Sequence, residues 1–156
     1  MRRTDRAVTD AAEITQIMSR CEVLRLAINT GEAPYILPVN FGMEPDGMTL
    51  YIHGAVEGTK YNLLEKDNRV GFELDCTQGL VLEEDRHNCT MNYESVVGWG
   101  IVDEVTGEDE KIHALDRIMA QYHAGDFAYS KKPVPVTRIL RLTVKKRTGK
   151  RRKKIM

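Results

Sequence analysis

Short apolar segments separated by turn residues run along most of the chain. Their residues alternate with polar ones or are β-branched and aromatic, which is typical of β-strands. The predicted strands are Val23–Asn29, Pro34–Phe41, Met48–His53, Arg69–Asp75, Tyr93–Val105 and Thr137–Val144, with a shorter run at Gly79–Leu82. Few of the connections are long enough for a parallel crossover. We therefore predict a mainly β fold, a six-stranded antiparallel sheet closed into a small barrel, because closure removes exposed edges.

Three segments have apolar residues at helical spacing instead. The first begins at a capping box, Asp10-x-x-Glu13, and is followed by an apolar stripe. The second is short and contains Tyr61 and Leu64. The third spans Glu108–Tyr122 and carries the longest apolar stripe of the three.

Glycine and proline mark the turns and irregularities of the predicted strands. Gly31 is free to take the positive φ of a hairpin turn. Pro38 has no N–H for a ladder hydrogen bond, so its strand is expected at a sheet edge or at a bulge. Gly98 and Gly100 within one long strand predict a bend or the close approach of another backbone. The charged segment Glu83–Asn88 is predicted to be a loop.

The composition is that of an ordinary globular chain, but the charges are unevenly distributed. The 156 residues predict one domain, residues 1–156, with 42% hydrophobic and 29% charged residues. The formal net charge is zero, yet the segment from Arg138 onward has ten Lys/Arg and no Asp/Glu. The preceding 137 residues carry 13 Lys/Arg against 23 Asp/Glu, a net charge of −10. We interpret residues 145–156 as a basic C-terminal tail on an acidic body.

Such a tail suits nucleic acid, an acidic membrane surface or the acidic body of a partner subunit. Nucleic acid is disfavoured, because the tail has no interleaved aromatic residues for base stacking and the body is acidic. No apolar run of transmembrane length and no signal peptide are present, and Cys21, Cys76 and Cys89 are too sparse for a disulfide framework. These features predict a cytoplasmic protein. Cys76, His87 and Cys89 match no zinc spacing and lack a fourth ligand, so we predict no metal site.

The clearest candidate chemistry lies in His53–Lys60 (HGAVEGTK), between a predicted strand and a predicted helix. A strand that feeds a glycine-containing turn at a helix start presents free backbone N–H groups and a positive dipole end, which suit a phosphate. Gly58 allows close backbone approach, Thr59 offers a hydroxyl and Lys60 offers a charge. The spacing is neither that of a Walker A loop nor that of the dinucleotide fingerprint. The alternative is an ordinary strand-to-helix turn with a solvated lysine.

Four motifs, in this order, resemble one known family. They are Pro38-Val-Asn-Phe-Gly42, His53-Gly-Ala-x-x-Gly-x-Lys60, Tyr93-x-Ser-Val-Val-Gly98 and Thr148-Gly-Lys150. Together they resemble the flavin-binding split-barrel proteins related to pyridoxamine 5′-phosphate oxidase. More narrowly they are similar to the nitroimidazole-resistance (Nim-type) branch, which the opening Arg3-x-Asp-Arg6 also fits. No basic cluster for a second, substrate phosphate is found, which argues against vitamin B6 oxidation, and Thr59 stands where Arg is common in Nim-type relatives.

This resemblance implies a split β-barrel that forms a homodimer and binds one FMN in each of two grooves at the interface. The cofactor-binding residues that it implies are Pro38, Val39, Asn40, Phe41, His53, Gly54, Gly58, Thr59, Lys60, Tyr93, Ser95 and Lys150. The strand around Asn40 would lie along the flavin ring, and Thr59 and Lys60 would hold the phosphate with help from His53. Tyr93 and Ser95 would line the ribityl and phosphate end, and Lys150 would reach across from the second subunit. Each role has a structural alternative: core packing for Val39 and Phe41, a satisfied strand edge for Ser95, and a solvated charge for Lys150.

The leading functional hypothesis is an FMN-dependent oxidoreductase of the flavin-reductase or nitroreductase type. Hydride would pass from a reduced nicotinamide to the flavin, and electrons would then pass to a small planar acceptor such as a nitroaromatic. No side-chain nucleophile is required, and His53 is the candidate catalytic proton donor because imidazole titrates near neutral pH. The alternative is a flavin-binding or storage protein without turnover, or a relative that binds haem or a deazaflavin in the same barrel.

Overall fold

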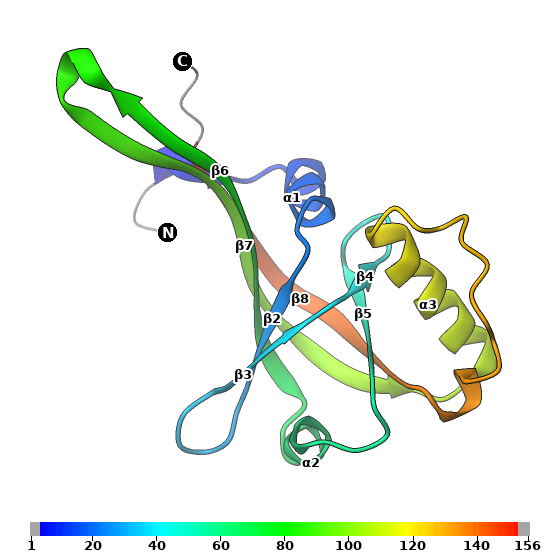
Figure 1. Ribbon diagram of the computed structural model, residues 1–156. Helices are drawn as coiled ribbons and strands as arrows, with labels where there is room; N and C mark the ends of the chain where they lie inside the picture. The colour runs from blue at the N-terminus through cyan, green and yellow to red at the C-terminus, as the bar shows by residue number, and fades with distance from the viewer. Residues whose placement is uncertain (1–3, 153–156) are drawn as a thin grey trace.

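An antiparallel sheet of eight strands forms the body of the protein (Figure 1). The computed structural model describes residues 4–152, without the side chains of Thr77 and Gln78. The strands are β1 Ala7–Val8, β2 Leu24–Ile28, β3 Tyr35–Val39, β4 Gly42–Met43, β5 Thr49–Gly54, β6 Arg69–Glu83, β7 Asn88–Val105 and β8 Arg138–Arg152. The helices are α1 Ala11–Ser19, α2 Thr59–Lys66 and α3 Glu108–Gln121, with short 3-10 turns η1 Thr4–Arg6, η2 Glu84–Arg86 and η3 Val134–Val136. The prediction of a mainly β, antiparallel fold with three helices is confirmed for the described residues.

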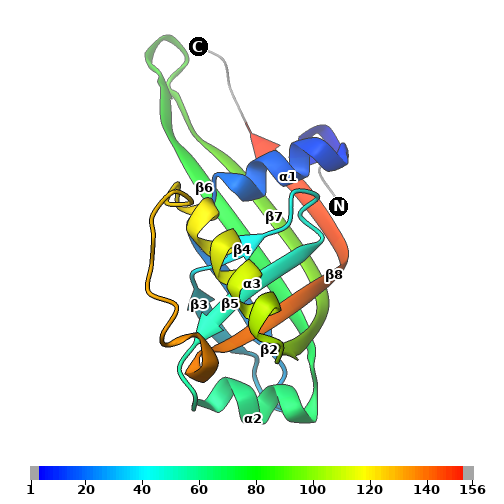
Figure 2. The same cartoon turned by 90° about the vertical axis from the view of Figure 1, so that its right-hand side faces the viewer.

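The sheet is strongly curled (Figure 2). Its two edge strands, β3 and β4, are consecutive in the sequence. Its order is β3-β2-β6-β7-β8-β5-β4, with β1 paired to β8. Since β3 ends at Val39 and β4 begins at Gly42, only Asn40 and Phe41 connect opposite edges of the sheet. Within residues 4–152 no ladder joins β3 to β4, so the closure of a six-stranded barrel is not shown. The edge position predicted from Pro38 is confirmed, because β3 pairs with β2 alone among the described strands.

A long hairpin made by β6 and β7 projects from the body (Figure 1). The sequence predicted two shorter strands, Arg69–Asp75 and Tyr93–Val105, with an isolated run between them. Instead, both strands continue to the η2 turn, and a register shift between Thr77 and Gly79 absorbs the irregularity. We call the outer part of this hairpin, residues 79–92, the arm.

The basic segment after Val144 is a strand and not a tail, at least as far as the structure describes it. β8 runs to Arg152 and pairs with β7 along its length, while Lys153, Lys154 and the Arg3 of the opening motif lie outside the described residues. Its side chains alternate between two faces. Arg147 and Arg151 point to the face covered by α1, where they contact Thr15 and Glu94. The opposite face of β2, β6, β7 and β8 is called the outer face below.

The core consists of two apolar clusters on opposite faces of the sheet, because Tyr51 and Ile139 of the smaller cluster alternate along β5 and β8 with residues of the larger one. The larger one includes Leu24, Leu50, Leu74 and Leu142, all fully buried, together with the apolar side of α1. The smaller one packs α3 against β5 and β8 through residues that include Ile118 and Ile139. The capping box is confirmed, since the side chain of Asp10 accepts a hydrogen bond from the Glu13 N–H at 2.8 Å.

Gly98 and Gly100 are positions of close backbone approach, as predicted. A Cβ at Gly98 would overlap the Lys146 carbonyl oxygen and lie 2.5 Å from the Phe72 ring. A Cβ at Gly100 would overlap the Thr143 carbonyl oxygen. The β7–β8 register shifts between Trp99 and Gly100, where β8 has one extra residue, Lys145, so the two glycines lie at a bulge of β8.

Replacing Arg147 with alanine is expected to lower the free energy of unfolding by about 2 kcal/mol, because several hydrogen bonds to a charged group are lost. The Arg147 guanidinium donates to the carbonyl oxygens of Gly47 at 2.9 Å and Asp46 at 3.0 Å, and to the hydroxyl of Thr15 at 3.0 Å. It thereby ties α1 to the turn between β4 and β5. Urea unfolding checks the prediction, and Lys145→Ala, at an exposed position in the same strand, should stay within about 0.5 kcal/mol of the parent.

Candidate cofactor site

The glycine-containing turn between β5 and α2 forms as predicted. Gly58 is the N-cap of α2 and has φ +155°, a conformation that residues with a side chain rarely adopt. Because Gly58 has no side-chain acceptor, the first N–H groups of α2 have no side-chain cap. The turn is fixed at two carbonyls: Tyr61 Oη donates to Ala55 at 2.7 Å, and Arg138 Nη1 donates to Val56 at 3.2 Å.

The Lys60 ammonium lies at this turn beside a second cation. Its Nζ is 4.5 Å from the centroid of the Tyr61 ring, and the guanidinium carbon of Arg138 is 3.6 Å from the same centroid. A Cβ at Gly54 would lie 3.0 Å from Lys60 Nζ, so the glycine leaves room for the lysine. Burial, and then the charge of Arg138, lower the pKa of Lys60. Within residues 4–152 no carboxylate forms an ion pair with Lys60, so a bound anion would relieve the repulsion between the two cations.

Arg138 is the member of this cluster that sequence analysis missed. It stands opposite Gly54 in the β5–β8 ladder and donates two hydrogen bonds to Glu104, at 2.8 and 2.6 Å. Glu104 therefore orients the guanidinium and balances much of its charge. The position of Arg138 beside the turn follows from the register of β5 against β8, for which the sequence carries no signal.

His53 is not brought to Lys60. Its neighbour Tyr51 and its ladder partner Ile139 both belong to the apolar cluster under α3. Alternation along β5 therefore places His53 on that side and Gly54, with Lys60 Nζ next to it, on the opposite side. His53 is exposed at its position near the end of the strand.

Tyr93, Ser95 and Lys150 come together on the outer face of β7 and β8. Ser95 is directly opposite Lys150 in the ladder, and Lys150 Nζ is 5.5 Å from the centroid of the Tyr93 ring. Arg6, from the opening motif, donates to the Tyr93 hydroxyl at 3.3 Å. Burial acts to raise the pKa of Tyr93, but hydrogen bonds and charges from Arg6 and Lys150 outweigh it, and the pKa is lowered. This group is a second cationic centre.

The Pro38–Phe41 segment occupies a third place, at the sheet edge and its link to β4. Phe41 is fully buried and belongs to the core. The Phe41 N–H and the Asn40 side-chain amide both donate to Tyr122 Oη, at 3.2 and 3.1 Å, and Tyr122 Oη donates to the Glu22 carbonyl at 2.6 Å. These polar groups, in the segment that the resemblance placed along the flavin ring, are thus already hydrogen-bonded inside the chain.

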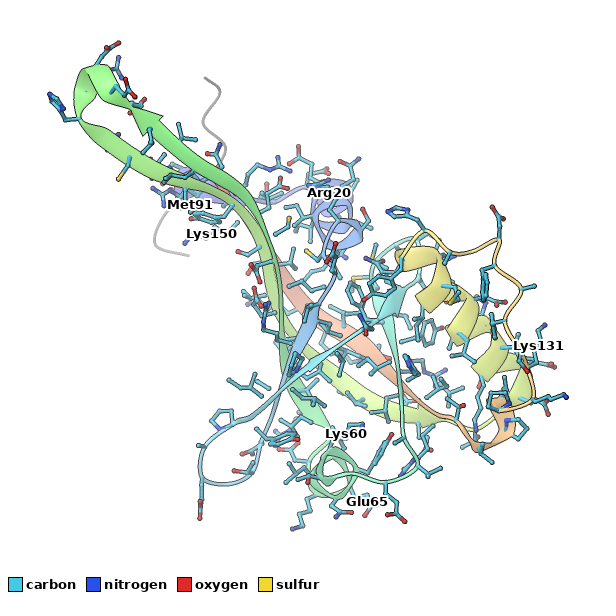
Figure 3. The ribbon with its side chains drawn as sticks, in the orientation of Figure 1. Arg20, Lys60, Glu65, Met91, Lys131 and Lys150 are labelled. Atoms are coloured by element: carbon cyan, nitrogen blue, oxygen red, sulfur yellow. The ribbon has the colours of Figure 1, made fainter. Side chains whose placement is uncertain are left out.

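The predicted residues therefore form three separate groups and not one pocket. Figure 3 shows Lys60 and Lys150 well apart, with a long stretch of the sheet between them.

Two cavities lie near these groups. One cavity has a volume of about 570 Å³ and has Tyr61 and Arg138 in its wall. Its lining also includes three acidic residues, Asp67, Asp103 and Glu104, which would repel an anion inside this cavity. Another of about 540 Å³ lies between the C-terminal ends of α1 and α3. Across residues 4–152, no group of three or more His, Cys, Asp or Glu side chains is placed to hold a metal ion. None of the described helices is long and apolar enough to cross a membrane.

The curled antiparallel sheet and the glycine–lysine turn at the start of α2 define a class of small, mainly β proteins with a candidate phosphate site. The chain belongs to the pyridoxamine 5′-phosphate oxidase family, whose model matches residues 10–151. The family resemblance that the sequence motifs indicated is thus confirmed. A comparison with curated proteins finds no match.

Solved structures of related fold include one with clear sequence similarity. A candidate 5-nitroimidazole antibiotic resistance protein from Bacteroides thetaiotaomicron is 31% identical, with 92% of this chain and 85% of that chain covered and a TM-score of 0.81. The flavocytochrome Anf3 from Azotobacter vinelandii is 20% identical, over 99% of this chain and 72% of that one, with a TM-score of 0.81. An FAD and haem binding protein from Mycobacterium smegmatis is 18% identical, over 96% and 74%, with a TM-score of 0.80. The first supports the Nim-type resemblance, and the other two show the fold alone.

Proposed function

We propose that this protein binds FMN as a homodimer and uses it to pass electrons from a reduced nicotinamide to a small planar acceptor such as a nitroaromatic. The observation that carries the proposal is the Lys60 ammonium, which lies beside Arg138 at the start of α2 without a carboxylate partner in the described part of the chain. Family membership over residues 10–151 and the 31% identical nitroimidazole-resistance candidate support it.

The residues of the turn fit a flavin phosphate. The Lys60 ammonium, the Thr59 hydroxyl and the N–H groups that follow Gly58 all donate hydrogen bonds, which phosphate oxygens accept. Gly54 and Gly58 leave backbone exposed where a side chain would otherwise stand. FMN is preferred to FAD because its one phosphate needs one anion site. When bound, the flavin would supply the hydride and electron chemistry, while these residues would bind and orient it. His53, on the other side of β5, has no part in holding the phosphate.

The visible absorption spectrum of the purified protein, before and after acid release of any ligand, is the first test. We expect flavin bands and free FMN in the supernatant, whereas FAD would correct the cofactor and a Soret band would point to haem. Steady-state oxidation of a reduced nicotinamide with a nitroaromatic acceptor then separates an enzyme from a flavin-binding protein without turnover.

Replacing Lys60 with alanine is expected to weaken FMN binding by roughly 10- to 100-fold. A hydrogen bond to a charged group contributes about 1.5–3 kcal/mol, and each 1.4 kcal/mol is a factor of ten in affinity. Flavin fluorescence titration measures the change. Riboflavin, which lacks the phosphate, should bind the parent and the variant alike.

The matched control is Lys66→Ala, which removes an exposed lysine from the last turn of the same helix. It should leave FMN affinity within about twofold of the parent. An equal loss of FMN and riboflavin affinity in Lys60→Ala would show that Lys60 supports the fold of the site and does not bind a phosphate.

A further inference from the structure

Two of the three cysteines lie side by side at the end of α1. Cys21 follows the C-cap of α1 and is 2% exposed, and its thiol donates to the Ile17 carbonyl oxygen at 3.2 Å. Cys76 lies on β6, partly buried against the larger core cluster, and its thiol donates to Glu94 Oε2 at 3.8 Å. The sulfur atoms of Cys21 and Cys76 are also within hydrogen-bonding reach of each other. Two residues that are distant in sequence thus form a dithiol pair.

The pairing of the strands explains why these two residues meet. The β2–β6 ladder ends, in this direction, at Arg25 opposite Glu73. In the same antiparallel direction, the segment that leads from α1 into β2 runs alongside the part of β6 that contains Cys76. Cys76 is directly opposite Glu94 in the β6–β7 ladder, so both side chains point to the side of the sheet that α1 covers. The register of the sheet therefore holds Cys76 beside Cys21.

Cys76 is the thiol of the pair that ionises first. Burial, and then the charge of Glu94, raise the pKa of Cys76, but a hydrogen bond from Cys21 and the charge of Arg20 act against them. Arg20, at the end of α1 (Figure 3), also hydrogen-bonds the Cys76 sulfur. Burial raises the pKa of Cys21 further, with a contribution from Cys76. Since the thiolate is the nucleophile, Cys76 reacts before Cys21, and it reacts slowly near neutral pH.

A small oxidant can reach this pair through the cavity between the C-terminal ends of α1 and α3. The cavity has a volume of about 540 Å³, and Arg20 and Cys21 are in its wall together with Ser19 and Glu22. Ser19, Arg20 and Glu22 are exposed, so the cavity opens to solvent beside Cys21. Hydrogen peroxide is little larger than water, which occupies about 30 Å³ in the liquid, and it fits easily.

We propose that Cys21 and Cys76 form a reversible disulfide when the protein meets a peroxide, and that this bond fixes the end of α1 to β6. In the first step the Cys76 thiolate attacks one oxygen of hydrogen peroxide. The O–O bond breaks, hydroxide leaves with the proton that Cys76 had released, and Cys76 becomes a sulfenic acid. In the second step the Cys21 sulfur attacks the Cys76 sulfur, and the S–O bond breaks. The hydroxide takes the thiol proton of Cys21, so both sulfurs are oxidised and the peroxide is reduced to two water molecules.

The bond closes a covalent loop that contains β2, β3, β4, β5 and α2. Cross-linking a loop of this length lowers the entropy of the unfolded chain. We expect the oxidised protein to have a Tm about 10 °C above that of the reduced protein. The disulfide does not depend on the flavin binding proposed above, and a colourless protein would form it equally.

Peroxide treatment of the full chain carrying Cys89→Ser tests the proposal. Cys89 is exposed on the arm and could cross-link two chains, so its removal leaves only the pair. After several hours in about 1 mM hydrogen peroxide, we expect both remaining thiols to be lost. The chain should lose the mass of two hydrogen atoms, and its digest should contain Cys21 and Cys76 in one cross-linked peptide. Dithiothreitol should restore both thiols and the lower Tm.

Cys76→Ser and Cys21→Ser in the same background are the matched controls, because each keeps one thiol of the pair. Each is compared with its own untreated sample, so any loss of stability from the substitution itself cancels. Peroxide should raise the Tm of neither. Oxidation of Cys76 to the sulfinic acid without a cross-link would overturn the proposal. So would two intact thiols after a treatment that fully oxidises a free cysteine peptide, or an equal rise of Tm in Cys76→Ser.

Discussion

Replacing Gly42 with alanine is expected to destabilise the protein by about 3 kcal/mol, because overpacking a tight contact forces backbone to move. Gly42 lies in β4, directly beneath α3. A Cβ there would overlap the backbone of Ile118 and Arg117, and would stand 2.6 Å from the Arg117 carbonyl oxygen. Since these are backbone atoms and not the end of a flexible side chain, the whole helix must shift. For a chain of this length the loss corresponds to a fall of about 10 °C in Tm.

The shift of α3 would also break the hydrogen bonds that seat it. Arg117 Nε donates to the Met43 carbonyl at 2.8 Å, and His113 Nε2 lies 2.6 Å from Glu44. Thermal and urea unfolding measure the loss. Gly125→Ala, whose added methyl group would meet only Ala120 at 3.9 Å, should stay within about 0.5 kcal/mol of the parent. A Gly42→Ala variant as stable as Gly125→Ala would show that α3 does not sit directly on β4.

Removing the charge of Glu94 is expected to cost a similar amount, about 3 kcal/mol in Glu94→Gln. Glu94 is 2% exposed on the α1 side of β7. It accepts hydrogen bonds from Arg20 at 2.6 Å and from Arg151 at 2.5 Å. When the carboxylate charge of a buried ion pair is removed, the positive charges of its partners are left uncompensated, and this typically costs about 3–5 kcal/mol of stability. Here the partners are Arg20 and Arg151. We place the value at the lower end because the Arg20 side chain is 45% exposed.

The loss should depend on pH. Burial acts to raise the pKa of Glu94, but the hydrogen bonds and charges of Arg20 and Arg151 outweigh it, so the pKa is lowered in the folded state. A carboxylate whose pKa is lowered by folding stabilises the folded state fully at pH values above its unfolded-state pKa, which is about 4.3 for Glu. This stabilisation is lost as the pH falls through the folded-state pKa. The difference in unfolding free energy between the parent and Glu94→Gln should therefore be full at pH 6 and shrink below about pH 4.

Urea unfolding at a series of pH values tests this, with Glu13→Gln as the matched control. Glu13 also pairs with Arg151, at 3.6 Å, but its side chain is 50% exposed, so about 0.5 kcal/mol or less is expected at any pH. A difference for Glu94→Gln that stays constant from pH 6 to pH 3 would mean that packing, and not the carboxylate charge, accounts for the loss.

Glu94 and Arg147 also show why part of the fold could not be predicted. Both point to the covered face of the sheet, where apolar residues were expected, and both bind polar partners there. A strand whose inward residues are Arg147, Gly149 and Arg151 has no apolar alternation, so residues 145–152 resembled a solvated tail. The strands that were predicted correctly bury apolar residues: β2 buries Leu24, Leu26 and Ile28 at alternating positions, and β5 buries the three consecutive residues 50–52.

The candidate site divides in the same way. Local features were predictable, because the strand, the Gly58 turn and the start of α2 are contiguous in sequence. Lys60 was predictable for the same reason. Arg138 was not, because it meets the turn through pairing with Gly54. His53 is separate from Lys60 because its side chain points to the side of β5 that faces α3, whereas the Lys60 ammonium lies on the other side, beside Gly54. Which side faces α3 is decided by tertiary packing and not by the motif.

The central place of β8 has a consequence for how the chain folds during synthesis. β8 is the last strand in sequence, yet it stands between β7 and β5, and it also pairs with β1. Until it leaves the ribosome, the β4–β5 hairpin has no strand to join, although it was made some ninety residues earlier. Because domains fold as units, a nascent chain that has passed Val105 but has not yet reached β8 exposes two unfinished sheet edges, one on β7 and one on β5. The protein therefore acquires its native sheet in one late step, and we expect its nascent chains to depend on chaperones until that step is complete.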